Sequence, residues 1–148
     1  MQAKRIIPSL LLCNSRLVKG SEFINHVDAG NPVTTIRAHN AQGADEILLL
    51  DIQASKNKCP PDFKTIKAAA DECFAPLTVG GGISSLDIAN KCFDNGADKI
   101  FLNTSAIENP ELITKIANRF GSQAVMLGLD LYCKDVDINT YDFRNEKV

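Results

Sequence analysis

The 148-residue sequence has no tryptophan, only two histidines and no long apolar run. Its first apolar run, from Ile6 to Cys13, contains Pro8 and has eight residues, whereas a membrane-spanning helix needs about 20. The opening residues also lack the pattern of a secretory signal. From these absences we expect that the chain is not a membrane protein and that it has no membrane partner.

The five cysteines form no C-x-x-C pair, and their number is odd. A zinc site is built from clustered cysteine and histidine ligands, and only His26 and His39 could join the cysteines. We therefore expect no metal site, and no motif indicates a cofactor. Reduced cysteines in a cytoplasmic protein are the simplest interpretation.

Neither sign of charge is in large excess, because 16 Lys and Arg stand against 18 Asp and Glu. A nucleic-acid-binding protein would present a basic stripe, and none is visible, so no nucleic acid partner is expected. Hydrophobic residues make up 45% of the chain, which is ordinary for a globular protein. A chain of this length is expected to form one domain and to bury roughly 70% of its unfolded surface.

Short apolar runs alternate with helical patterns along the chain. The clearest strand, residues 46–52, is apolar without alternation, as in a parallel strand covered on both faces. Further strands are expected at 5–12, 76–79, 99–103 and 124–131. Helices are expected to begin at Asn31-Pro32, at Pro61, at Ser85 and at Asn109-Pro110, with glycine stops at Gly43, Gly96 and Gly121. This order predicts an α/β protein with a parallel sheet.

An internal repeat supports a barrel. The segment 43–49 (GADEILL) matches 96–102 (GADKIFL) at an offset of 53 residues, the length of two strand–helix units. The alternative is that Gly-Ala-Asp before a strand is common helix-stop chemistry. Residues 132–148 differ from the rest and are expected to form a hairpin or an irregular tail after the fifth strand.

Polar and glycine-rich segments follow four of the five expected strands, where parallel barrels place their chemistry. Three glycines after the third strand would expose backbone N–H groups at a helix start, which suits a phosphate. A tight turn explains the glycines equally well. The aspartates could also be caps or turn formers. The candidate residues are Asp51, Gly81, Gly82, Asn103, Thr104 and Asp130.

Charged residues begin three of the expected strands. Arg5, Glu46 and Lys99 would cluster around the axis at the opposite face of the barrel. Spacing alone favours a ring of compensating charges that stabilises this end.

Several segments together resemble one known family, the cyclase subunit of imidazole glycerol phosphate synthase. They cover nearly the whole chain in order: 3–8 (AKRIIP), 18–20 (VKG), 51–52 with 54–55 (DI, AS), 78–83 (TVGGGI), 96–99 (GADK), 103–104 (NT) and 120–125 (FGSQAV). The resemblance implies a (β/α)₈ TIM barrel of about 250 residues. This chain would supply an N-terminal half-barrel of four strand–helix units and a fifth strand.

The resemblance also implies an activity in histidine biosynthesis. Such a lyase receives ammonia from a glutaminase subunit through the barrel axis. The ammonia reacts with a phosphorylated substrate, a phosphoribulosyl formimino nucleotide, to give imidazole glycerol phosphate and an aminoimidazole carboxamide nucleotide. By position in the family motifs, the implied residues are Asp130 as a catalytic acid or base, Lys19 in the first loop as a substrate contact, Gly82, Asn103 and Thr104 at one phosphate site, Arg5, Glu46 and Lys99 at the ammonia gate, and Asp98 and Gln123 at the glutaminase interface.

Two departures set this sequence apart from that pattern. The family has a second catalytic aspartate where this chain has Leu11, and leucine cannot exchange a proton. The sequence stops after the fifth expected strand, before the elements that build the second phosphate site. The chain alone is therefore expected to be inactive, and to self-associate or pair with a C-terminal half-barrel.

Two other interpretations stay open. The segment Leu10-Leu11-Leu12 resembles a subgroup of cyclase-like proteins associated with surface-polysaccharide genes, which are thought to deliver ammonia to a sugar amidotransferase. The third interpretation is a non-catalytic fragment whose role is binding or nothing.

Overall fold

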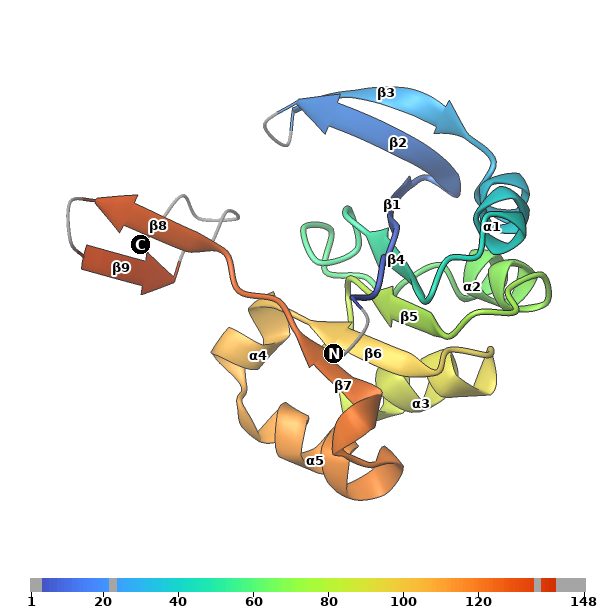
Figure 1. Ribbon diagram of the computed structural model, residues 1–148. Coiled ribbons are helices and arrows are strands. Elements are labelled where there is room, and N and C mark those ends of the chain that lie inside the picture. The colour runs from blue at the N-terminus through green and yellow to red at the C-terminus, as the bar shows by residue number, and fades with distance from the viewer. Residues whose placement is uncertain (1–3, 22–23, 135–136, 141–148) are drawn as a thin grey trace.

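The computed structural model describes residues 4–21, 24–134 and 137–140, and its centre is one curved sheet of seven strands in the order β3-β2-β1-β4-β5-β6-β7 (Figure 1). Five of these strands run parallel: β1 (Ser9–Cys13), β4 (Ile47–Asp51), β5 (Leu77–Gly80), β6 (Lys99–Leu102) and β7 (Val125–Leu127). The predicted α/β class with a parallel sheet is confirmed. The sheet does not close on itself, and this arrangement is that of a partial TIM barrel.

Four helices cover the outer face of the sheet, as Figure 1 shows. They are α1 (Pro32–Ala41), α2 (Phe63–Ala70), α3 (Leu86–Asp94) and α5 (Glu111–Phe120). Side chains at Asn31 and Ser85 cap α1 and α3 as predicted, accepting hydrogen bonds from Val33 N–H at 2.9 Å and from Ile88 N–H at 3.3 Å. The helix predicted to open at Pro61 instead begins two residues later, because the Asp62 carboxylate caps it.

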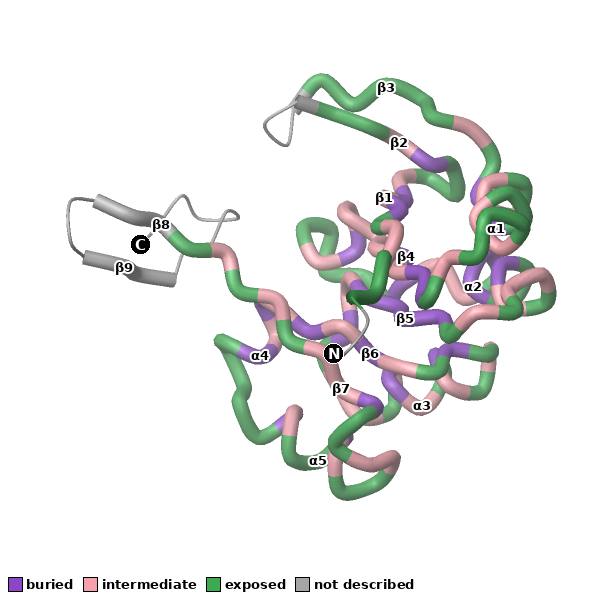
Figure 2. The backbone as a smooth tube through the Cα atoms, viewed as in Figure 1, coloured by how far each residue is buried: buried purple, intermediate pink, exposed green. Residues whose placement is uncertain are grey.

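The core lies between the sheet and these helices. Every second residue of the parallel strands points into it, including Leu12, Ile47, Leu49, Leu77 and Ile100. Figure 2 shows the buried residues concentrated there, whereas the outer segments are exposed. The alternate residues of the same strands face the open, concave side of the sheet, where barrels place their axis.

Two predicted strands have different boundaries in the structure. The first strand begins at Ser9 and not at Arg5, because Pro8 has no N–H to donate to a ladder. The fifth, β7, ends at Leu127 and not near residue 131; the Gly128 N–H still donates to the Leu102 carbonyl at 2.8 Å, and residues 128–130 are not part of a strand. Both differences leave the strand order unchanged.

Three elements were not predicted as such. An antiparallel hairpin of β2 (Arg16–Ser21) and β3 (Ile24–Gly30) extends the sheet beyond β1. A short helix, α4 (Thr104–Glu108), follows β6 directly, and a 3₁₀ turn (Ser122–Ala124) precedes β7. A second hairpin, β8 (Leu131–Lys134) with β9 (Asp137–Thr140), is not one of these three, because it lies where a hairpin or an irregular tail was expected; it stands apart from the sheet in Figure 1. The expected tail beyond residue 140 lies outside the described residues.

The 53-residue repeat has a structural cause. The Asp45 carboxylate accepts a hydrogen bond from Ile6 N–H at 2.7 Å, and Asp98, its repeat equivalent, accepts one from Leu77 N–H at 2.8 Å. Each aspartate thus links the start of the strand that follows it, β4 or β6, to the neighbouring segment of the sheet. The glycines that precede them, Gly43 and Gly96, both have positive φ, as helix-ending glycines do.

Candidate functional site

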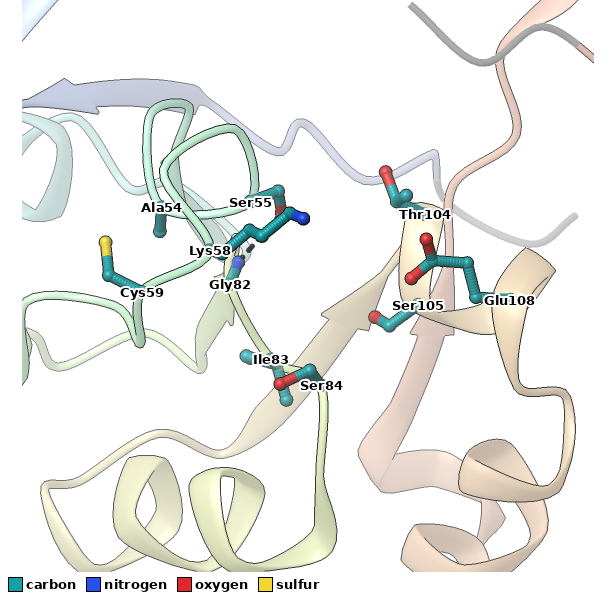
Figure 3. A pocket seen from close by; sticks show the side chains of 10 residues that line it. All are labelled: Ala54, Ser55, Lys58, Cys59, Gly82, Ile83, Ser84, Thr104, Ser105 and Glu108. Atoms are coloured by element: carbon teal, nitrogen blue, oxygen red, sulfur yellow. Dashed lines mark hydrogen bonds between the residues drawn. The ribbon is translucent and has the colours of Figure 1, made fainter. Parts of the chain in front are cut away.

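A polar hollow lies at the carboxyl ends of β4, β5 and β6. It has a volume of about 180 Å³ and is bounded by the loop after β4, the glycine loop after β5 and helix α4 (Figure 3). Gly82 and Thr104 are among its lining residues, whereas Gly81 and Asn103 lie just beside it in the chain. The other polar lining residues are Ser55, Lys58, Ser84, Ser105 and Glu108.

The loop after β5 requires glycine at positions 81 and 82 because the loop after β4 leaves no room for side chains there. A Cβ at Gly81 would lie 2.0 Å from the Asp51 carbonyl oxygen, and one at Gly82 would lie 2.3 Å from the Cys59 carbonyl oxygen. Both residues also have positive φ, 96° and 68°, which disfavours other residues. This close approach brings the two loops together and forms one wall of the hollow.

Asn103 connects the hollow to the predicted catalytic aspartate. Its Nδ2 donates a hydrogen bond of 2.8 Å to the Asp130 carboxylate, while its backbone carbonyl starts the first turn of α4. The structure therefore brings together Asn103, Thr104 and Asp130 from the ends of β6 and β7.

Asp51 has a structural task at the end of β4. Its carboxylate accepts hydrogen bonds from the backbone N–H groups of Gln53 and Ala54, each at 3.1 Å, which is the geometry of a turn former. Burial raises the pKa of the Asp51 carboxyl above its ordinary value, although these two hydrogen bonds act in the opposite direction. The carboxyl is therefore held by its own loop.

Lys19 is exposed on strand β2, in the hairpin that connects β1 to α1. The hairpin leaves the end of β1 and arches over the top of the sheet in Figure 1. The Arg16 guanidinium pairs with the Asp28 carboxylate across it at 2.9 Å. The structure does not place Lys19 among the residues that line the hollow.

Leu11 belongs to a continuous line of apolar residues on the concave face. In register it lies beside Leu50 of β4, which pairs with Gly80 of β5, which in turn pairs with Phe101 of β6. The side chains of Leu50 and Phe101 meet above Gly80, where a Cβ would lie 2.6 Å and 2.9 Å from them. We refer to Leu11, Leu50 and Phe101 as the apolar row.

The ring of Phe101 also leaves no room for a side chain at Gly128, directly after β7. A Cβ at Gly128 would lie 2.0 Å from the Cζ of Phe101, so the ring rests on the backbone at both Gly80 and Gly128. Position 11 therefore lies in apolar surroundings on the concave face, formed by residues of β1, β4 and β6.

At the opposite end of the strands, a charged cluster surrounds Glu46. This side chain is 1% exposed and accepts hydrogen bonds from Lys99 Nζ at 2.6 Å, from Thr78 Oγ1 at 2.5 Å and from Arg5 Nη1 at 3.3 Å. Burial by itself would raise the pKa of the Glu46 carboxyl, but these hydrogen bonds and the charges of Lys99 and Arg5 outweigh it, so the pKa lies below its ordinary value. The cluster holds an ionised carboxylate at the entrance to the concave face.

The two predicted interface residues lie near the same end. Asp98 is exposed but fixed by its bond to Leu77 N–H. Gln123 is exposed on the turn before β7, and its Nε2 donates to the Phe120 carbonyl at 3.3 Å. Both side chains have structural partners and also reach the surface.

With this geometry in place, comparison with known proteins identifies the family. The model of the family described as "Histidine biosynthesis protein" matches residues 5–147. The chain belongs to this histidine biosynthesis family. The match covers every strand and helix described above.

Three similar proteins are named as subunits of imidazole glycerol phosphate synthase. An imidazole glycerol phosphate synthase subunit HisF from Alkaliphilus metalliredigens is 47% identical over 131 residues, which are 88% of this chain and 52% of that protein. One from Methanoregula boonei is 48% identical over 128 residues, 86% of this chain and 48% of that protein. A putative imidazole glycerol phosphate synthase subunit hisF2 from Campylobacter jejuni is 44% identical over 145 residues, 98% of this chain and 58% of that protein.

These similarities confirm the predicted resemblance to the cyclase subunit. The chain spans about half the length of the curated relatives it matches. Catalytic roles therefore remain proposals for this histidine biosynthesis protein.

Sequence reasoning missed the lining residues that come from loops. Ser55 belongs to one of the segments that resemble the family, but its position beside Gly82 depends on how the loop after β4 packs on the loop after β5. Lys58 has φ of 52°, a strained backbone conformation that a sequence cannot display. Phe101 was visible only as a residue of the repeat.

Among the described residues, no group of three or more His, Cys, Asp or Glu side chains is arranged to hold a metal ion. In the same part of the chain, no helix combines the length and apolar character that crossing a membrane requires.

Proposed function

We propose that this chain provides one phosphate-binding half of a cyclase-type site and receives ammonia from a glutaminase subunit. The substrate would be the phosphoribulosyl formimino nucleotide, and the products imidazole glycerol phosphate and an aminoimidazole carboxamide nucleotide. The observation that carries this proposal is the hollow at Gly82 and Thr104, with Asn103 joined to Asp130 at its edge. In this proposal Asp130, whose carboxylate accepts the hydrogen bond from Asn103, exchanges the proton on the concave side.

In this proposal the cluster of Arg5, Glu46 and Lys99 forms the ammonia gate. Its ion pairs lie at the end of the strands opposite the hollow, and Asp98 and Gln123 on the same end would meet the glutaminase. Lys19 and Asp51 would contact substrate after it binds. Lys19 must then approach the hollow by movement of the β2–β3 hairpin.

The test is an ammonia-dependent assay with the formimino nucleotide. We expect background turnover from this chain, because Leu11 supplies no second acid or base and losing one such group costs about 10²–10⁴ in rate. The assay should include Leu11→Asp and each protein mixed with a C-terminal half-barrel from a relative. Turnover that requires the added half and Asp130 supports the proposal, and robust turnover by the unmodified chain alone contradicts it.

A second candidate function is favoured by the apolar row. A face lined by Leu11, Leu50 and Phe101 passes a small neutral molecule but supplies no protons, which suits delivery of ammonia to a separate sugar amidotransferase. Here a glutaminase partner should be activated by the chain without formimino nucleotide. If the added half-barrel restores cyclisation while Leu11 is kept, this second candidate fails. If the glutaminase neither binds nor responds, only a non-catalytic fragment remains.

We also propose that the open side of β7 is covered by another polypeptide, either a second copy or a C-terminal half-barrel. In the seven-stranded sheet, β7 pairs on one side only, and Leu127, Leu129 and Leu131 along this stretch are exposed. Exposed edges with apolar neighbours are association sites. Sedimentation that shows a stable monomer, unchanged by the added half, would contradict this.

A further inference from the structure

The N–H group of Gly82 is already engaged within the hollow. It donates a hydrogen bond of 3.0 Å to the Oγ of Ser55, drawn as the dashed line in Figure 3. The group that a glycine loop is expected to offer to a phosphate is therefore bonded to a side chain. An anion could reach it only by displacing the Ser55 hydroxyl.

Ser55 is held in place by the turn that contains it. The Ser55 carbonyl accepts from Lys58 N–H at 3.2 Å, and the Ala54 carbonyl accepts from Cys59 N–H at 3.0 Å. The turn also packs directly on Gly82, where a Cβ would lie 2.6 Å from the Cβ of Ala54. The turn thus fixes the Ser55 backbone beside Gly82, and the hydroxyl leaves the Gly82 N–H only by rotating about χ1.

A serine hydroxyl has one proton to donate in addition to its two acceptor sites. Because the oxygen of Ser55 accepts from Gly82, its own proton must point elsewhere, and the residue lines the hollow. A hydrogen bond received by a hydroxyl strengthens the one that it donates. The Lys58 side chain, on the same wall of the hollow in Figure 3, adds a positive charge beside it.

We infer that Ser55 is an anion-binding residue of the hollow, a donor that passes the polarisation of the Gly82 N–H to a phosphate group. This inference rests on the proposed phosphate site and assigns it a ligand contact beyond Gly82, Asn103 and Thr104. Gly82 then acts through Ser55, and its lack of a side chain lets the turn come close. The volume of about 180 Å³ suits a phosphate monoester carrying a short polyol.

The experiment is calorimetric titration of the full chain with glycerol 3-phosphate, for the unmodified protein and for Ser55→Ala, Ser55→Thr and Ser9→Ala. We expect Ser55→Ala to weaken binding about tenfold, the usual effect of losing one hydrogen bond to a charged group. Ser55→Thr keeps the hydroxyl and should bind within about threefold of the unmodified chain. Ser9 is exposed at the start of β1, at the end of the strands opposite the hollow, and Ser9→Ala is the matched control that should bind normally.

The outcomes separate the inference from the proposed function. Unmodified protein that shows no saturable binding overturns the phosphate site itself, and the inference with it. Normal binding by Ser55→Ala, or tighter binding, overturns only the inference, because it means that the anion takes the Gly82 N–H directly. A purely structural role predicts a lower melting temperature for ligand-free Ser55→Ala with an unchanged dissociation constant, so both quantities are measured.

Discussion

At the scale of single residues, the identity of position 11 depends on its neighbours across the sheet. Leu11 is half-buried and lies beside Leu50, whose side chain meets the ring of Phe101 above Gly80. A carboxylate introduced there has no cation in the apolar row to pair with. Burying a polar group without a partner costs about 1–3 kcal/mol.

We therefore predict that Leu11→Asp lowers the free energy of unfolding by about 2 kcal/mol and gives no turnover by itself. Leu11→Met, which nearly conserves volume, is the control and should cost less than about 1.5 kcal/mol. Combining Leu11→Asp with Phe101→Ser should cost less than the sum of the two single changes, since both alter the same row. Urea unfolding of the unmodified chain and the four variants, Phe101→Ser alone included, measures these costs, and a Leu11→Asp variant as stable as the unmodified chain would contradict the apolar row.

At the scale of elements, the loop after β5 is defined by how closely it approaches the end of β4. Gly81 has positive φ, and a Cβ there would meet backbone, which cannot move aside as a side chain can. Gly43, at the end of α1, also has positive φ, but no heavy atom lies within 4 Å of its Cβ position. Comparing substitutions at the two glycines therefore distinguishes the cost of backbone strain, present at both, from the cost of a steric clash, present only at Gly81.

Gly43→Ala should lose about 1 kcal/mol of stability, which is the cost of the left-handed conformation alone. Gly81→Ala should lose more than about 3 kcal/mol, because the clash with the Asp51 carbonyl adds to that cost. It should also abolish binding of glycerol 3-phosphate at the hollow. Thermal unfolding of the two variants tests this, and equal losses would mean that the loops are not in close contact.

At the scale of the whole molecule, the charged cluster makes stability depend on pH. The pKa of Glu46 is lower in the folded chain than its ordinary value of 4.5. A carboxyl of this kind contributes stability that is fully present above the unfolded pKa and is lost as pH falls through the folded pKa. Asp62, whose pKa is also lowered, acts in the same direction: burial would raise it, but hydrogen bonds from Ser15 and Thr65 prevail.

The free energy of unfolding should therefore change little between pH 7 and pH 5 and decrease below about pH 4.5. Glu46→Gln should cost about 3 kcal/mol at pH 7, because it leaves the Lys99 ammonium, 22% exposed, without its carboxylate. The difference between the two proteins should become smaller in acid. Urea unfolding at a series of pH values measures both effects, and a constant difference between pH 7 and pH 3 would exclude Glu46 as a source of the slope.

The sequence by itself determined the features that depend on neighbouring residues. The caps at Asn31 and Ser85, the helix stop at Gly96 and the continuous apolar strands each involve atoms within a few positions of one another. The order of strands and helices then leaves few arrangements besides a parallel sheet. The predicted start of the first strand was wrong because Pro8 cannot donate a hydrogen bond to the neighbouring strand. The β2–β3 hairpin was not predicted because its exposed residues carry no alternating apolar pattern.

Only the tertiary structure decided which distant residues meet. Glu46 and Lys99 occupy equivalent positions of the repeat and pair with each other because β5 places their strands on either side of Thr78. Leu11 joins Phe101 through Leu50, and Ser55 takes the Gly82 N–H, by strand register and loop packing over separations of 27 to 90 residues. Register and packing are set by the whole core acting together, so no local pattern in the sequence records them.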